Sequence, residues 1–107
     1  MNDVQHFEAA RALAERVIAE GGQDDASKLQ WLFRTVLSRK PDAKESPMLT
    51  ASLAKQRALY QNDPKAAEKA ILVGESTPKK IAPPAETAAW ALIANLVLNL
   101  DETVSRN

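Results

Sequence analysis

The stretch that decides the fold is Pro84-Ala-Glu-Thr-Ala-Ala-Trp-Ala-Leu-Ile-Ala-Asn-Leu-Val-Leu-Asn-Leu-Asp101, near the end of the 107-residue chain. Wound as an α-helix, it places apolar side chains on nearly every side. A helix that is apolar all round needs neighbours on several faces, so we expect it to run from about Pro84 to about Asp101 at the centre of a bundle. Trp90 has Ile93 and Val97 as apolar neighbours on this helix, which predicts that Trp90 belongs to the core.

Helical periodicity recurs in the rest of the chain, whereas the period-two pattern of strands does not. The first helix is predicted at roughly residues 3–20. The second helix follows Asp24 or Asp25, either of which can cap it, and it ends before Pro41. Its apolar stripe is the clearest in the chain and consists of Leu29, Leu32, Phe33, Val36 and Leu37.

Two signals compete for the start of the third helix. Asp42 with Glu45 makes a capping box, whereas Ser46-Pro47 makes a cap followed by a proline at the first helical position. We place the regular helix at 47–61, after a looser turn.

A short fourth helix is predicted after Asn62-Asp63-Pro64, ending at Gly74. Residues 75–84 hold three prolines and are expected to form an irregular crossing segment. The chain is long enough for one hydrophobic core and not two. We therefore predict an all-α fold, a compact bundle of four to five helices with the last helix central, in which residues 1–107 form a single domain.

Composition and charge exclude several classes of function. The chain has no cysteine, which rules out thiol catalysis, iron–sulfur clusters, covalent haem attachment and disulfides. Lysine plus arginine equals aspartate plus glutamate at 14 each, so no net field attracts nucleic acid or an anionic membrane. A local basic group lacks interleaved aromatic residues and a recognisable motif; it consists of Arg34, Arg39, Lys40 and Lys44. The longest apolar run falls far short of the ~20 residues of a spanning helix, and we predict neither a nucleic-acid nor a membrane partner.

Catalytic constellations are missing from the sequence. His6 is the single histidine and has no second histidine or cysteine with which to bind a metal. The serines have no Gly-x-Ser-x-Gly elbow, and three glycines form no phosphate loop. The pairs Asp24-Asp25 and Asp101-Glu102 lack the spaced oxygen ligands of a calcium loop. We predict no catalytic residue, no cofactor and no metal site, and therefore no enzyme activity.

One aromatic residue is placed oddly for a buried core. On the second helix, Trp31 falls nearly opposite the apolar stripe, beside Lys28 and Arg34. One explanation is that the chain covers the ring itself, through the 75–84 crossing or its Ile81. The other is that Trp31, Arg34 and Lys28 contact a partner, either a second copy or another protein surface, because tryptophan and arginine dominate binding hot spots.

Three segments of the chain carry a family resemblance. They are Asn-Asp-x-x-x-Phe-Glu-Ala-Ala-Arg-Ala-Leu-Ala-Glu-Arg-Val at 2–17, Leu-x-x-x-Phe-Arg-x-Val-Leu-Ser-Arg-x-Pro at 29–41 and Glu-x-Ala-Ala-Trp-x-x-x-Ala-Asn-x-x-Leu-Asn-Leu-Asp-Glu-Thr at 86–103. In this order they resemble the C-terminal tail of a planctomycete domain of unknown function. That domain ends large exported proteins that carry a cytochrome-c-like haem domain near the N-terminus.

The resemblance implies a context and no reaction, because the activity of that family is not established. This chain departs from it in having no signal peptide and no Cys-x-x-Cys-His motif. As written the chain is expected in the cytoplasm, or exported if it is part of the larger family protein. The expected function is a non-catalytic structural or protein-interaction module. The alternative is an accessory C-terminal part of an exported redox or hydrolytic enzyme whose active site lies outside this chain.

Overall fold

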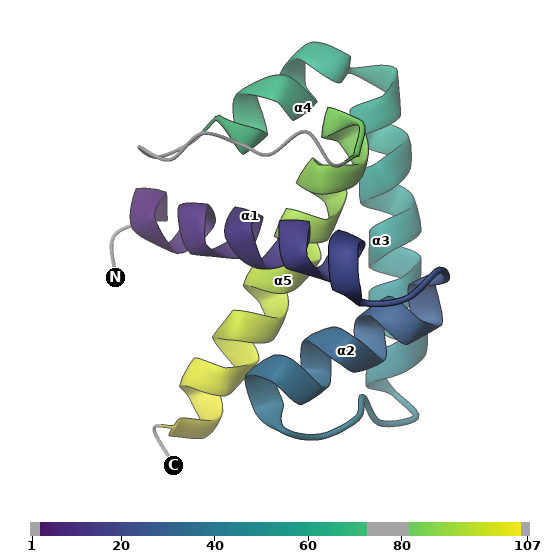
Figure 1. The fold of residues 1–107 in the computed structure, drawn as a ribbon, viewed down its shortest axis with the longest axis vertical. Coiled ribbons are helices and arrows are strands. Elements are labelled where there is room, and N and C mark those ends of the chain that lie inside the picture. The colour runs from purple at the N-terminus through teal and green to yellow at the C-terminus, as the bar shows by residue number, and fades with distance from the viewer. Residues whose placement is uncertain (1–2, 73–81, 106–107) are drawn as a thin grey trace.

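Five α-helices make up the described part of the chain (Figure 1). The structure is a computed structural model that describes residues 3–72 and 82–105, with side chains described for 8–72 and 82–100. The helices are α1 (Asp3–Glu20), α2 (Asp25–Leu37), α3 (Glu45–Asn62), α4 (Pro64–Ile71) and α5 (Pro84–Ser105). No strand occurs in these described ranges, which confirms the predicted all-α class. The last helix continues to Ser105, past its predicted end, and most of the predicted 75–84 crossing lies outside the described residues.

The central helix is α5, as predicted. It contacts each of the other four helices, and Figure 1 shows α1 crossing it while α3 and α4 lie along its N-terminal half. The contact with α1 is the most extensive. Both helices carry buried alanines, Ala10 and Ala14 on α1 and Ala91 and Ala94 on α5, and small side chains of this kind allow helices to pack at short distance.

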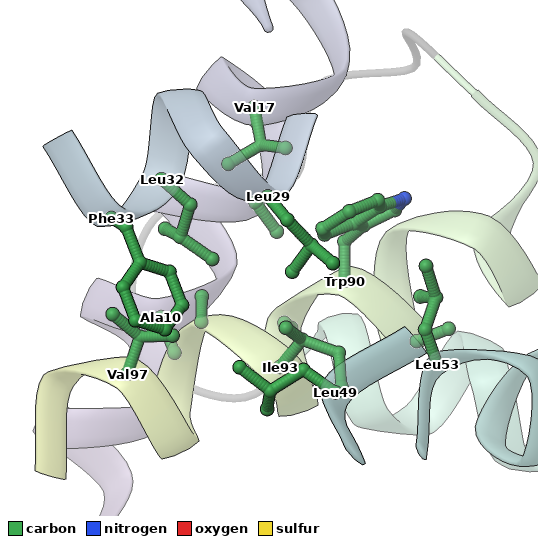
Figure 2. Packing of buried hydrophobic residues seen from close by; sticks show 14 residues of the cluster. Ala10, Val17, Leu29, Leu32, Phe33, Leu49, Leu53, Trp90, Ile93 and Val97 are labelled. Atoms are coloured by element: carbon green, nitrogen blue, oxygen red, sulfur yellow. The ribbon is translucent and has the colours of Figure 1, made fainter. Parts of the chain in front are cut away.

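One apolar cluster joins four of the helices. Figure 2 shows labelled side chains from α1, α2, α3 and α5 pointing into a common interior. From the predicted stripe of α2, Leu29, Leu32 and Phe33 are fully buried, while Val36 and Leu37 pack against the edge. Trp90 is 0% exposed, so its predicted place in the core is confirmed.

The start of α3 corrects the prediction. The helix begins at Glu45 and not at residue 47, because the capping box forms: the Asp42 carboxylate accepts from the Glu45 N–H at 2.7 Å, and the Glu45 carboxylate accepts from the Asp42 N–H at 3.0 Å. Pro47 lies inside the first turn. It has no N–H to donate to the carbonyl of Ala43, whereas the Ser46 N–H just before it donates to the Asp42 carbonyl at 3.1 Å.

The turn between α1 and α2 depends on glycine. A Cβ on Gly21 would lie 2.5 Å from the Val17 carbonyl oxygen and 3.1 Å from the Cα of Lys28, and Gly22 has a φ of 104°. The start of α2 can therefore pack directly against the end of α1. Of the two cap candidates that the sequence offered, Asp24 and Asp25, it is Asp24 that caps α2, by accepting from the Ser27 N–H at 2.7 Å.

Candidate protein-contact site

Trp31 is half-buried on α2, and part of its cover comes from α1. The guanidinium of Arg16 lies over the indole, with its Cζ 5.1 Å from the ring centroid. Arg16 is itself held by Glu20, whose carboxylate accepts from Nε at 3.3 Å. The cover predicted from the 75–84 crossing falls on Ile81 and its neighbours, which lie outside the described residues.

An open groove of about 450 Å³ runs beside Trp31, between the end of α1 and the outer side of α2. Its lining consists of Gly21, Ser27, Gln30, Trp31, Arg34 and Thr35. The α2 residues recur every three or four positions, which places them along one side of the helix. The structure thus brings together two of the three residues predicted for partner contact, Trp31 and Arg34. Lys28 is not in the lining, because its side-chain stem lies against the turn at Gly21.

Arg34 differs from the arginines around it. Its side chain is exposed at the groove, and within the described part of the chain it forms no hydrogen bond or ion pair. A guanidinium carries five N–H donors in a fixed planar arrangement that matches a carboxylate. Arg34 therefore presents an unused anion-binding group next to a half-buried aromatic ring.

A second arginine site has a different character and was not predicted. Arg57 of α3 donates to the Glu86 carboxylate of α5 at 2.7 and 2.8 Å, and to the Asp25 carboxylate of α2 at 3.0 and 3.1 Å. The same Glu86 accepts from the indole N–H of Trp90 at 3.1 Å. The hydrogen bonds that Arg57 donates, first to Glu86 and then to Asp25, raise the pKa of Arg57. We call these four residues the Arg57 clasp; it joins three helices.

Only a weak sequence signal could have pointed to the clasp. Asp25 and Glu86 stand in the first turns of their helices, where the helix dipole favours a carboxylate. Nothing local pairs either of them with Arg57, because the contacts join residues 32 and 29 positions apart.

A third ion pair closes the connection between α2 and α3. Arg39 donates to both carboxylate oxygens of Glu45, at 2.7 and 3.0 Å, and its Cζ lies 5.3 Å from the centroid of the Phe33 ring. The hydrogen bond from Arg39, followed by that from the Asp42 N–H, lowers the pKa of Glu45 to about 2.

The described residues hold no cluster of three or more histidine, cysteine, aspartate or glutamate side chains that could bind a metal. The side chains of His6, Asp101 and Glu102 are outside the described part. Among the described helices, none has both the length and the apolar character that crossing a bilayer requires.

Comparison of the chain with protein families, with curated proteins and with solved structures finds no match in any of the three. The comparisons therefore supply neither a family nor an activity, and the resemblance to the planctomycete domain stays an expectation.

Proposed function

We propose that this chain is a non-catalytic helical module that binds another protein surface through the groove between α1 and α2. The observation that carries the proposal is that half-buried Trp31 lies in that groove beside Arg34, whose side chain has no partner among the described residues. Tryptophan and arginine are the residue types most enriched among binding hot spots, because they combine large apolar area with directional hydrogen bonding.

The setting of Trp31 supports a binding role. Its ring is held by the α2 backbone, by the core beneath it and by Arg16 above it, so little freedom remains to be lost when a partner docks. The groove is open along one side. Small-molecule sites enclose most of their ligand, whereas side chains from a protein partner need only one open face.

The family resemblance adds a context to this proposal. If the chain is the tail of a larger exported protein, the bound surface belongs to the remainder of that protein, and the module is an accessory part of a redox or hydrolytic enzyme. If it acts alone, the partner is a separate chain. The groove has the same role in both cases.

The experiment is peptide selection on the intact chain. A random peptide library displayed on phage is selected on the wild type, and bound peptides are then measured against Trp31→Ala. We expect at least about a tenfold loss of affinity on Trp31→Ala, which corresponds to about 1.4 kcal/mol, and no loss on Leu59→Ala. Leu59 is a matched control because its side chain is 53% exposed on α3, away from the groove.

Folding of the variant is checked separately. Trp31 is only half-buried, so we expect Trp31→Ala to lose about 1 kcal/mol of unfolding free energy and to keep its helical circular dichroism. If no selected peptide depends on Trp31 and the wild type sediments as a monomer at high micromolar concentration, the proposal is wrong.

A further inference from the structure

We infer that the groove takes an acidic protein segment, with a carboxylate bound to Arg34 and an adjacent apolar side chain against Trp31. This inference rests on the proposed function and adds the chemistry of the partner.

The described lining of the groove is positively charged. Among the described residues that line it, none is acidic and Arg34 alone carries charge. The carboxylates that lie within three residues of the lining residues Gly21 and Ser27 are already engaged: Glu20 holds Arg16, Asp24 accepts from the Ser27 N–H, and Asp25 is paired with Arg57. The described part of the chain thus supplies no carboxylate to Arg34, and an incoming one would complete an ion pair with it.

The spacing of Trp31 and Arg34 on α2 suits two adjacent groups of a bound segment. Trp31 and Arg34 are three residues apart, so they stand one above the other on neighbouring turns, with Cβ atoms ~5–6 Å apart. Adjacent positions of a bound segment can reach both. Gln30 and Thr35 add polar groups to the lining that can bond to the backbone of the segment.

The groove suits an acidic protein segment better than a nucleic acid. A single strand needs a row of cations that follows its phosphates, together with aromatic rings on which successive bases stack. The described lining of the groove offers one arginine and one aromatic ring, and Arg16 already covers one face of that ring. A single carboxylate beside an apolar side chain matches that arrangement better than a repeating polyanion does.

The test extends the peptide selection. Peptides selected on the wild type are expected to be enriched in aspartate or glutamate next to an apolar residue. Synthetic peptides from that pool should lose at least about tenfold in affinity on Arg34→Glu and weaken as salt is added. They should be unaffected by Lys65→Glu, which makes the same charge change on α4, a helix without appreciable contact with α2.

The outcomes distinguish this inference from the proposed function. Peptides that depend on Trp31 but carry no acidic enrichment would leave the groove as a binding site and overturn its acidic partner. An absence of any Trp31-dependent peptide, together with a wild type that stays monomeric at high micromolar concentration, would overturn both. Single-stranded RNA that binds more tightly than the peptides and is lost on Arg34→Glu would reassign the groove to nucleic acid. Self-association of the wild type that Arg34→Glu abolishes would assign it to a second copy.

Discussion

Trp90 and Trp31 each lie close to an arginine-containing network, but the chain uses the two tryptophans in opposite ways. Trp90 is fully buried on the central helix, and its indole N–H bonds to Glu86, which Arg57 holds in place. Trp31 is half-buried at the edge of the molecule, with Arg16 over its ring and an open groove beside it.

The difference lies in whether the chain completes its own charge pairs. In the Arg57 clasp, two carboxylates from two helices meet one guanidinium, so the polar groups around Trp90 are satisfied internally. At the groove, Arg16 has Glu20, but Arg34 has no carboxylate among the described residues. An aromatic residue whose neighbouring charged groups are all paired within the chain is typical of a folded core. One whose neighbouring arginine has no partner is typical of a contact surface.

The largest effect is expected from Trp90→Ala, which empties the centre of the core. We expect a loss of ~3–5 kcal/mol in unfolding free energy, measured by urea denaturation, because a large buried ring is removed and a cavity remains. Trp31→Ala should lose far less unfolding free energy than Trp90→Ala. Equal losses for the two variants would remove the distinction between a core and a surface tryptophan.

The next largest loss of unfolding free energy is expected at Arg57, and Arg34 serves as the comparison. Arg57→Met leaves Asp25 and Glu86 without their cation and is expected to lose about 1–3 kcal/mol, less than a fully buried pair because the clasp is partly solvated. Arg34→Met is the matched control, with an expected loss under about 0.5 kcal/mol because no partner is left behind. Urea denaturation of both variants makes the comparison. An Arg34→Met loss as large as that of Arg57→Met would mean that the groove arginine is structural.

The smallest effect should appear at the α2–α3 connection, as a dependence on pH. Because the pKa of Glu45 falls from 4.5 to about 2 on folding, its ionised form stabilises the fold above pH 4.5, and this contribution is lost as the pH falls towards 2. Arg39 is half-exposed, so screening by solvent keeps the contribution of the pair to stability small. Glu45→Gln should therefore be less stable than the wild type near neutral pH, and the gap should close in acid. A gap that stays constant with pH would show that the ion pair contributes nothing to stability.

Local features of the fold were predictable because they depend on residues three or four positions apart. The stripe of α2, the Asp24 cap and the buried side of α5 all follow from helical spacing. The start of α3 was mispredicted for a local reason as well. Two capping signals overlap there, and the Asp42–Glu45 box satisfies more backbone N–H groups than a cap at Ser46 with Pro47 would.

The candidate site was predictable only in part. The side of α2 that carries Trp31 and Arg34 follows from 100° per residue, so both were singled out before any tertiary information. Lys28 was singled out by the same rule, but its stem is taken up by the close approach of α2 to Gly21. Arg16 was missed as the cover of Trp31, because the two meet only when α1 and α2 pack side by side.

The sequence by itself determined the helices, their approximate ends, the central place of α5 and the tryptophan that stands outside the apolar stripe. These are consequences of side-chain periodicity and of backbone groups that are capped within one turn. Only the tertiary structure decided which charges meet. Arg57 finds Asp25 and Glu86 across three helices, while Arg34 is left without a partner in the described chain. Ion pairs between distant residues depend on how helices cross, and helix crossing leaves no period in the sequence from which the pairs could be inferred.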